Sequence, residues 1–379
     1  MKIAIDVSQI AYKGTGVAIY TSELVKHLIK LDYQNKYMLF GMSLRNKNTI
    51  TSFFDEIKKL NTDIDCKLLT IPQTVANVLW NKLHVLDIDK LIGSADILHS
   101  SDWIQPPTSA KKITTVHDLV VYKYPEVSHP YIVQTQKRRL YWVKKECDMT
   151  IADSLASRED LITTLHFNPS KVQVVYPGLQ EKYTRQNNKE KERVRKKYKL
   201  ANDYILAVGK IEPRKNLKTT LDCFEEFLNH PLISKSGKRF ELIIVGMEGW
   251  DNSIHIANDN IRMLGYIQDE DMPAFYSSAC LFLYPSLYEG FGLPILEAMA
   301  CGCPVVTSAR GSLKELAADA ALIVDPLNKK EIVDAIVSSV IDSKLRDDFI
   351  GKGLIQSKKF QWTKTANELI NIYKKVYKN

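Results

Sequence analysis

The chain has 379 residues, a length that suits two domains rather than one hydrophobic core, and its 45% hydrophobic and 25% charged residues are typical of a soluble globular protein. No apolar run approaches the ~20 residues that a membrane span needs, and the chain opens on a strand pattern with a charge inside it rather than on a signal peptide, so we expect a cytoplasmic protein. The formal net charge is +8, and the six cysteines lack the spacing of a zinc site, which predicts reduced thiols and no metal.

Short apolar segments alternate with helical or loop segments in two series. The first series predicts strands at residues 3–7, 37–40, 66–69, 97–99, 112–116, 149–152 and 172–175, and the second at 205–208, 241–245, 261–264, 281–284, 305–307 and 322–324. This alternation is typical of doubly wound, parallel-sheet α/β domains. The boundary should follow Pro177-Gly178, because residues 180–199 carry many charges and few large apolar groups, and the amphipathic segment 361–377 should form a last helix.

A glycine-containing loop follows the first strand. The run Gly14-Thr15-Gly16-Val17-Ala18-Ile19 begins like a dinucleotide fingerprint, but Ile19 stands where the third glycine belongs, which disfavours NAD or FAD. Gly14 and Gly16 would instead let backbone N–H groups at the start of a helix over 17–29 approach a phosphate or an acceptor. An ordinary turn explains the same residues.

A histidine and an aspartate, His117-Asp118, follow the strand expected at 112–116. Open α/β sheets bind ligands at the carboxyl ends of their strands, so the imidazole could hydrogen-bond a sugar hydroxyl or stabilise charge that develops at an anomeric carbon. The alternative is a structural histidine held by Asp118, which by itself is expected to form the turn.

Residues 134–145 combine five cations, Lys137, Arg138, Arg139, Lys144 and Lys145, with Leu140, Tyr141, Trp142 and Val143 at roughly helical spacing. This pattern suits an anionic membrane surface, although a solvated helix face with a buried stripe explains it as well. A second basic run covers residues 191–197. No motif that reads nucleic acid accompanies either run, so we expect no nucleic-acid partner.

The run Gly209-Lys210-Ile211-Glu212-Pro213-Arg214-Lys215-Asn216 follows the first strand of the second series and leads into a helix near 217–228. Arg214 can fork onto two phosphate oxygens and Lys215 adds a point charge close to a helix N-terminus, so the run predicts a diphosphate site that includes Gly209. The chain has no G-x-x-x-x-G-K-[ST], which disfavours a nucleoside triphosphate hydrolase. A solvated charged loop is the alternative.

Two carboxylates, Glu289 and Glu297, stand eight positions apart across a glycine-rich turn between an apolar strand and a helix. We expect Glu289 to follow the carboxyl end of the strand and Glu297 to lie in the first turn of the helix. Gly290 and Gly292 would let backbone N–H groups approach sugar hydroxyls or phosphate. The stretch therefore predicts a sugar-nucleotide site, unless Glu297 only complements the helix dipole.

Together these segments resemble the retaining nucleotide-sugar glycosyltransferases of family four, which have the GT-B fold of two Rossmann-like domains facing a central cleft. The resemblance covers nearly the whole chain and is carried by Gly14-Thr15-Gly16, residues 115–119, residues 212–216, the E-x7-E pattern from Glu289 to Glu297, and residues 298–306. The chain looks most like the branch that contains bacterial mannosyltransferases of polysaccharide assembly, a branch that also holds other donor specificities.

The resemblance implies a role for each site. Arg214 and Lys215 would bind the donor diphosphate without a metal, Glu297 would accept hydrogen bonds from the ribose hydroxyls, and Glu289 would hold the transferred sugar. The resemblance also implies that the backbone N–H groups of Phe291, Gly292 and Leu293 lie near the sugar and that the imidazole of His117 faces it. The loop glycine Gly16 would lie near the phosphates and the acceptor. The last helix, 361–379, would join an acceptor-side domain, 1–178, and residues 179–360 would form the donor domain.

We therefore expect an enzyme without cofactor that transfers a hexosyl unit with retention, using His117, Arg214, Lys215 and Glu289. The donor would be GDP-mannose first and a UDP-sugar second, and the acceptor a glycan or a lipid-linked glycan at the inner face of the membrane. Same-face attack, with the leaving phosphate taking the acceptor proton, is the mechanism that the resemblance suggests. A nucleotide-sugar epimerase or hydrolase of the same fold and a non-catalytic binding module are the alternatives.

Overall fold

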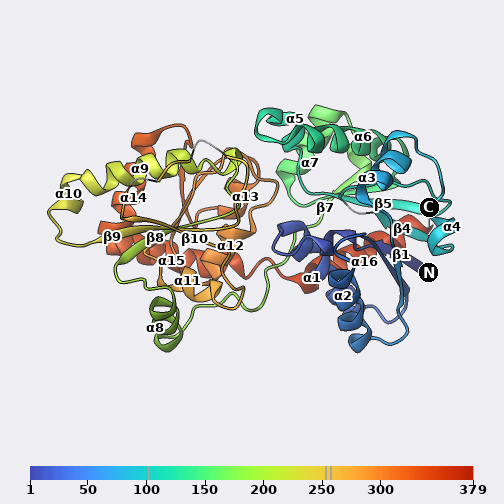
Figure 1. Ribbon diagram of the computed structural model, residues 1–379, viewed down its shortest axis with the longest axis horizontal. Helices are drawn as coiled ribbons and strands as arrows, with labels where there is room; N and C mark the ends of the chain where they lie inside the picture. The colour runs from blue at the N-terminus through green and yellow to red at the C-terminus, as the bar shows by residue number, and fades with distance from the viewer. Residues whose placement is uncertain (101, 252–253, 257, 379) are drawn as a thin grey trace. The chain divides into compact units, whose positions relative to one another are not determined.

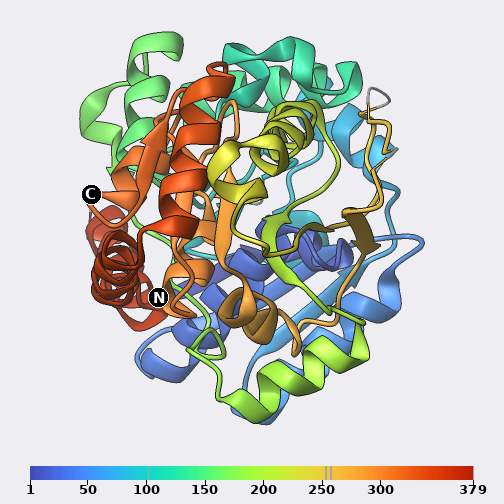
Figure 2. The same ribbon diagram turned by 90° about the vertical axis from the view of Figure 1, so that its left-hand side faces the viewer.

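The computed structural model describes residues 1–100, 102–251, 254–256 and 258–378. They form two compact α/β units, one made of Met1–Gly178 with Gln361–Asn379 and the other of Leu179–Phe360 (Figures 1 and 2). Asn379, the last residue of the expected terminal helix, lies outside the described residues. No helix among the described residues is long and apolar enough to cross a bilayer.

The first unit is built on a parallel sheet with the strand order β3-β2-β1-β4-β5-β6-β7. Its strands are β1 (Lys2–Asp6), β2 (Lys36–Met42), β3 (Asp65–Leu69), β4 (Ile97–Ser100), β5 (Lys111–Val116), β6 (Met149–Ala152) and β7 (Val172–Val174). The order reverses between β1 and β4, which pair with Ile5 opposite His99. Ligands of open α/β sheets bind beside the carboxyl ends of strands at such a reversal.

Helices cover both faces of this sheet (Figure 1). One face packs against α1 (Gly16–Leu31), α2 (Lys47–Leu60) and the terminal α16 (Trp362–Lys378). Side chains alternate along β1, so that Ile3 and Ile5 pack on this face while Ala4 packs on the other. The remaining helical segments are α3 (Gln73–Ala76), α4 (Asp89–Ile92), α5 (Val120–Lys123), α6 (Pro130–Glu146), α7 (Leu155–Leu165), the π-helical η2 (Asn77–Lys82), and the 3-10 turns η1 (Ser8–Ala11), η3 (Pro125–Val127) and η4 (Pro169–Lys171).

Helix α6 contains the basic and aromatic segment 134–145, and the expectation that Arg139 is one of its surface cations is wrong. Arg139 is 0% exposed and donates to Thr114 Oγ1 and the Thr115 carbonyl at 2.8 Å each, because it points into the unit rather than to solvent. The Trp142 ring stacks on His84 at 3.6 Å and its indole N–H donates to the Asn81 carbonyl at 3.0 Å. Burial of this stripe leaves Arg138, Lys144 and Lys145 among the exposed cations of the helix.

The second unit is built on a parallel sheet with the order β10-β9-β8-β11-β12-β13. Its strands are β8 (Asp203–Val208), β9 (Phe240–Val245), β10 (Ile261–Gly265), β11 (Leu281–Tyr284), β12 (Val305–Ser308) and β13 (Leu322–Val324). Here the order reverses between β8 and β11, which pair with Ile205 opposite Leu281. The carboxyl ends of these two strands therefore define the expected ligand edge of this unit.

The helices of the second unit again cover both faces. Figure 1 shows α9 (Leu217–Asn229) and α14 (Lys329–Ile341) on one side of the sheet, and α11 (Met272–Ser278), α12 (Leu293–Ala300) and α15 (Ser343–Ser357) on the other. Helices α9 and α14 also lie side by side in Figure 2. Lys329 of α14 donates to Asp222 of α9 at 2.6 Å. The unit is completed by α8 (Asn188–Lys197), α10 (Pro231–Ser234), α13 (Leu313–Ala317) and the 3-10 turn η5 (Pro213–Lys215).

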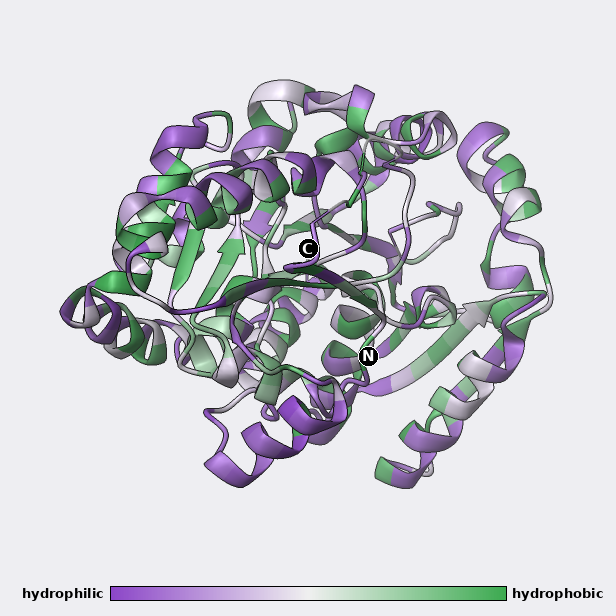
Figure 3. Cartoon of the chain, turned by 60° about the vertical axis from the view of Figure 1, so that its left-hand side comes forward, coloured by the Kyte–Doolittle hydropathy of each residue, from purple (hydrophilic) through white to green (hydrophobic). Residues whose placement is uncertain are grey.

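The hydropathy pattern explains this layering. Several strands are green along their length in Figure 3, whereas most helices alternate purple and green. Strands buried on both faces read as nearly continuous apolar runs, and surface helices bury one stripe only. The chain follows this rule in β9, all six residues of which are buried, and in α8, where Val194 is the buried residue.

Candidate active site

Two cations stand at the carboxyl edge of the second sheet because a short turn places them there. Arg214 and Lys215 lie in η5, between β8 and α9, and Asn216 follows with the left-handed φ of 57°. The amide of Asn216 donates to the carbonyls of Pro285 at 3.1 Å and Pro326 at 2.8 Å. These bonds tie the turn to the loops that follow β11 and β13, so the cations are fixed at the strand ends.

Glu289 lies between these cations. Its carboxylate accepts from Lys215 Nζ at 2.7 Å and from the Tyr284 hydroxyl at 2.9 Å, and it forms a further ion pair with Arg214. Arg214 is held in turn by Glu212, through Nε at 3.0 Å and Nη2 at 2.6 Å, and by the Tyr288 carbonyl at 2.9 Å. The structure thus brings together Arg214, Lys215 and Glu289, three of the residues predicted for the site.

The charges of this cluster fix its protonation. Burial by itself would raise the pKa of Glu289, but the charges of Arg214 and Lys215 and their hydrogen bonds outweigh burial and lower the pKa to about 2. Burial lowers the pKa of the Lys215 ammonium, while its contact with Glu289 opposes that change. The site therefore holds an ionised carboxylate between two cations. Arg214 and Lys215 can release Glu289 and bind another anion in its place.

The glycine-rich turn brings backbone N–H groups to the same edge. Gly292 is the N-cap of α12 with φ of 104°, a left-handed value that favours glycine, and Leu293 is the first residue of the helix. Phe291 is buried, and its carbonyl accepts from the Ser312 hydroxyl. A Cβ on Gly311 would lie 2.1 Å from the Glu289 carbonyl oxygen, so this glycine lets the neighbouring loop pack directly on the Glu289 backbone.

Glu297 belongs to a different contact set. It is the fifth residue of α12, not a residue of the first turn as expected, because the helix already begins at Leu293. Its carboxyl accepts from the Tyr276 hydroxyl at 2.9 Å and also bonds Tyr183, and burial raises its pKa to about 7 although these hydrogen bonds oppose the rise. A position beyond the first turn also weakens the alternative in which Glu297 only complements the helix dipole.

Gly209 directly follows β8, next to the cations. Its N–H donates to the Val245 carbonyl at 2.9 Å, and a Cβ built on it would lie 3.2 Å from Lys215 Cε. Gly209, Lys215 and Tyr284 line a small pocket between β8, β9 and β11. The structure thus places Gly209 beside the predicted diphosphate residues.

In the first unit, His117 forms a pair with an aspartate that sequence reasoning missed. His117 Nδ1 contacts Asp153 Oδ2 at 2.5 Å, whereas Asp118 accepts from the Val120 N–H at 3.0 Å and forms the turn. Burial by itself would lower the pKa of His117, but the Asp153 charge and hydrogen bond outweigh burial and raise it to about 9. Near neutral pH the imidazole is therefore a cation.

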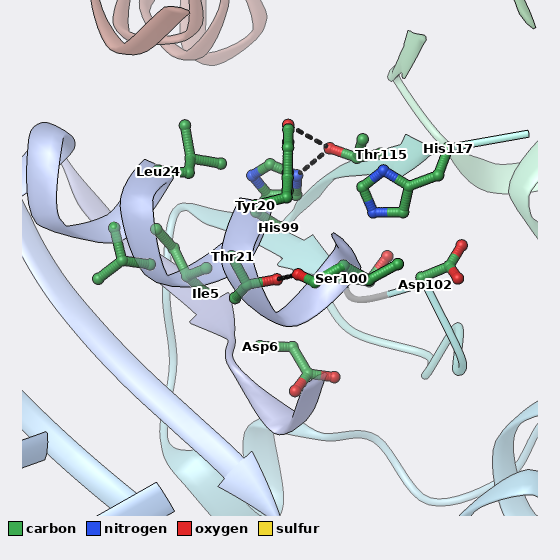
Figure 4. Close-up of a pocket in the computed structure, with 12 residues that line it drawn as sticks. Ile5, Asp6, Tyr20, Thr21, Leu24, His99, Ser100, Asp102, Thr115 and His117 are labelled. Atoms are coloured by element: carbon green, nitrogen blue, oxygen red, sulfur yellow. Dashed lines mark hydrogen bonds between the residues drawn. The ribbon is translucent and has the colours of Figure 1, made fainter. Parts of the chain in front are cut away.

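The loop glycines lie at the start of α1 in the same unit. Gly14 has φ of 79°, and Gly16 is the first residue of α1, where a Cβ would meet no atom within 4 Å. One turn further on, the Tyr20 ring meets the His117 ring edge to face at 4.8 Å, and its hydroxyl lies 3.3 Å from Thr115 Oγ1 (Figure 4). The first turns of α1 thus share a small pocket with His117, His99 and Asp102.

Known proteins match both halves of the chain. Residues 14–182 match the family model for Glycosyltransferase Family 4, and residues 188–356 match the model for Glycosyl transferases group 1. The O-antigen chain mannosyltransferase B of Escherichia coli is 30% identical over 393 aligned residues, which cover 99% of this chain and 100% of that protein. The chain belongs to glycosyltransferase family four.

Solved structures show that this glycosyltransferase has the GT-B fold. Sucrose-phosphate synthase from Thermosynechococcus elongatus matches with a TM-score of 0.74 and 19% identity, over 100% of this chain and 99% of that one. Anabaena HepE in complex with UDP-glucose matches with a TM-score of 0.73 and 16% identity, over 99% and 100%. The two parallel-sheet units of the glycosyltransferase are the two Rossmann-like domains that the sequence predicted.

Some site residues of the glycosyltransferase were missed, and only part of them left a signal. Asp153 directly follows β6, which pairs with β5 through Ala152 and Val116, so an aspartate at this strand end could have been paired with His117. Tyr284 is the last residue of a correctly predicted strand. Tyr183 and Tyr276 reach Glu297 from distant segments, and no spacing in the sequence indicates this contact.

The arrangement can bind a negatively charged ligand and hydroxyl groups. Arg214 and Lys215 can neutralise phosphate oxygens, while Glu289 and Glu297 can accept from hydroxyl groups. No group of three or more His, Cys, Asp or Glu side chains in the described part of the chain is arranged to hold a metal ion.

Proposed function

We propose that this glycosyltransferase transfers a hexosyl unit, mannose in the first place, from a nucleoside diphosphate sugar to an acceptor hydroxyl with retention of the anomeric configuration. The observation that carries the proposal is the cluster of Arg214, Lys215 and Glu289 at the carboxyl edge of the second sheet. Two cations beside a carboxylate suit a ligand that joins a diphosphate to a sugar. Residues 179–360 would then form the donor domain, and 1–178 with the terminal helix the acceptor side.

In this mechanism the protein acts mainly through charge. Arg214 and Lys215 stabilise the diphosphate as it leaves, and the N–H groups of Phe291, Gly292 and Leu293 add dipoles near the sugar. The protonated His117, whose ring contacts Asp153, would stabilise the sugar, and Gly14 and Gly16 would bind the phosphates or the acceptor. For retention, the acceptor attacks from the face that the diphosphate leaves, and a leaving oxygen takes its proton.

The proposed choice of donor rests on relatives. GDP-mannose is the first choice because O-antigen chain mannosyltransferase B is similar over the full length, and a UDP-sugar is the second because HepE is described in complex with UDP-glucose. Glu297 would accept from the ribose hydroxyls of either nucleotide. We propose a cytoplasmic enzyme of glycan assembly, with a glycan or lipid-linked glycan as the acceptor.

A donor panel tests this proposal. The protein is incubated with GDP-mannose, UDP-glucose and other nucleoside diphosphate hexoses, with and without a mannose-terminated acceptor, and the anomeric proton of each product is followed by NMR. We expect transfer that depends on the acceptor and gives the α-linked product from an α-linked donor. Inversion would contradict the mechanism, acceptor-independent turnover at the full rate would favour an epimerase or hydrolase, and sugar binding without turnover would favour a binding module.

We further propose that the enzyme contacts the inner leaflet through a surface of the first unit, which we call the η2–α6 surface. It combines the exposed cations Arg138, Lys144 and Lys145 with the exposed apolar side chains of Val75, Val78, Leu83, Val85, Leu86, Tyr131 and Tyr141. The stack of His84 on Trp142 holds the segment that follows η2 against α6. Cations around exposed apolar groups suit an anionic phospholipid surface.

Vesicle sedimentation tests this surface. Changing Arg138, Lys144 and Lys145 together to Glu should abolish binding to anionic vesicles at low salt, because each cation near such a surface contributes about 1 kcal/mol. The control changes Lys189, Lys196 and Lys199, three exposed cations of the second unit, to Glu and keeps the net charge equal. Equal loss in both variants, or no vesicle binding by the unchanged protein, would contradict the proposal.

A further inference from the structure

A buried tyrosine links one cation of the site to its carboxylate. Tyr284 is the last residue of β11 and is 3% exposed, and the ring of Phe282 stacks on it at 5.3 Å. Its hydroxyl donates to Glu289 Oε1 at 2.9 Å and accepts from the Lys215 ammonium, which also lies 4.8 Å from the centre of its ring. The phenol is thus a neutral bridge between a cation and a carboxylate.

The other two partners of Glu289, Arg214 and Lys215, are also the cations that would bind the donor diphosphate. If Arg214 and Lys215 turn to the diphosphate, Glu289 loses the two cations that keep it ionised, yet it remains 6% exposed. A buried carboxylate without donors favours the protonated form. A neutral phenol is attracted to the diphosphate far less than the cations are, so its hydrogen bond to Glu289 can persist.

We propose that Tyr284 is a positioning residue that keeps the Glu289 carboxylate ionised and aimed at the sugar when Arg214 and Lys215 engage the donor diphosphate. This inference rests on the proposed function, because it assumes that a diphosphate takes the two cations. The charged and titratable groups that face Glu289 are Arg214 and Lys215 from η5, Glu212 beside them, and Tyr284 itself from β11.

The test compares Tyr284→Phe with Tyr204→Phe. Tyr204 lies on the neighbouring strand β8, is buried, and donates its hydroxyl to the Phe275 carbonyl at 2.7 Å, so the control also removes one buried phenolic hydrogen bond from the same sheet. We expect Tyr284→Phe to lower kcat roughly 10- to 100-fold, as the loss of one hydrogen bond to a charged group would, and to leave the donor KM within about threefold. Tyr204→Phe should change neither.

A pH profile separates positioning from a loss of packing. Loss of a hydrogen bond to the charged form raises the pKa of a carboxyl, so the acidic limb of the kcat profile should move to higher pH in Tyr284→Phe and stay in place in Tyr204→Phe. If kcat and the acidic limb of its pH profile are unchanged in Tyr284→Phe, or if both variants change equally, the inference is overturned while the proposed function stays intact. Failure of the unchanged protein to bind GDP or UDP would instead overturn the proposed function.

Discussion

The contact between His117 and Asp153 gives the sharpest electrostatic prediction. Asp153→Asn removes the charge that holds the buried imidazole in its protonated form and keeps the size of the side chain. The ordinary pKa of histidine is 6.5 and the contact raises that of His117 to about 9, so the interaction favours the folded, protonated state by at most about 3 kcal/mol, because burial also raises the pKa of Asp153 and offsets part of the gain. Burial should then lower the pKa of His117 in the variant to 6.5 or below.

The sign of the pH dependence follows from this direction. A histidine whose pKa is raised on folding contributes stability that is fully present below pH 6.5 and is lost as the pH rises through about 9. Asp153→Asn should therefore lower the free energy of unfolding by up to about 3 kcal/mol at pH 6, and the difference from the unchanged protein should shrink across this window.

Two measurements check this prediction. Urea unfolding between pH 6 and 9.5 gives the stability difference, and NMR titration of the His117 Cε1 proton gives its pKa directly. Asp118→Asn is the matched control, because Asp118 accepts from the Val120 N–H and should leave the pKa of His117 unchanged. A His117 pKa near 6.5 in the unchanged protein, or one that responds to Asp118 rather than to Asp153, would refute the reasoning.

Three further predictions concern the second unit. Arg214→Ala should lower kcat roughly 10²- to 10³-fold with little loss of stability, as removal of one oxyanion donor does, and activity within about threefold of the unchanged enzyme would contradict a diphosphate role. The donor KM should fall as the pH rises through about 7, because the ionised Glu297 carboxylate accepts from ribose hydroxyls more strongly than the protonated carboxyl, and Glu297→Gln should remove this dependence; a pH dependence that survives in the variant would assign it to another group. Activity should persist in EDTA, since a guanidinium and an ammonium already neutralise the diphosphate, and loss that added Mg²⁺ restores would show a metal-dependent reaction.

The strands were predictable because their pattern is local. All of the strands expected from apolar runs occur, with ends that differ by no more than two residues, since a strand buried on both faces needs an uninterrupted apolar segment. The turn at Arg214 and the turn after Glu289 were also predictable, because proline, glycine and charge stand at fixed places after a strand.

Contacts between distant segments were not predictable in the same way. Arg139 was expected to be a surface cation because helical spacing does not reveal that its guanidinium donates hydrogen bonds to Asp102 and Thr114 inside the unit. Glu297 was expected in the first turn of α12 but is its fifth residue, because the helix begins directly after Gly292, whose left-handed φ few other residues adopt. The partners of His117 and Glu297 depend on tertiary packing, which a single sequence records only indirectly.

Calorimetric titration of nucleotide tests the central claim most directly, because it needs neither the acceptor nor the sugar. GDP and UDP are titrated into the unchanged protein, into Lys215→Ala, and into the control Lys218→Ala, whose exposed side chain pairs with Asp222 one turn into α9. We predict that the unchanged protein and the control bind one of the two nucleotides equally well, and that Lys215→Ala binds it about 10- to 100-fold more weakly. Equal affinity in all three proteins, or no binding of either nucleotide, would contradict a diphosphate site at Arg214 and Lys215.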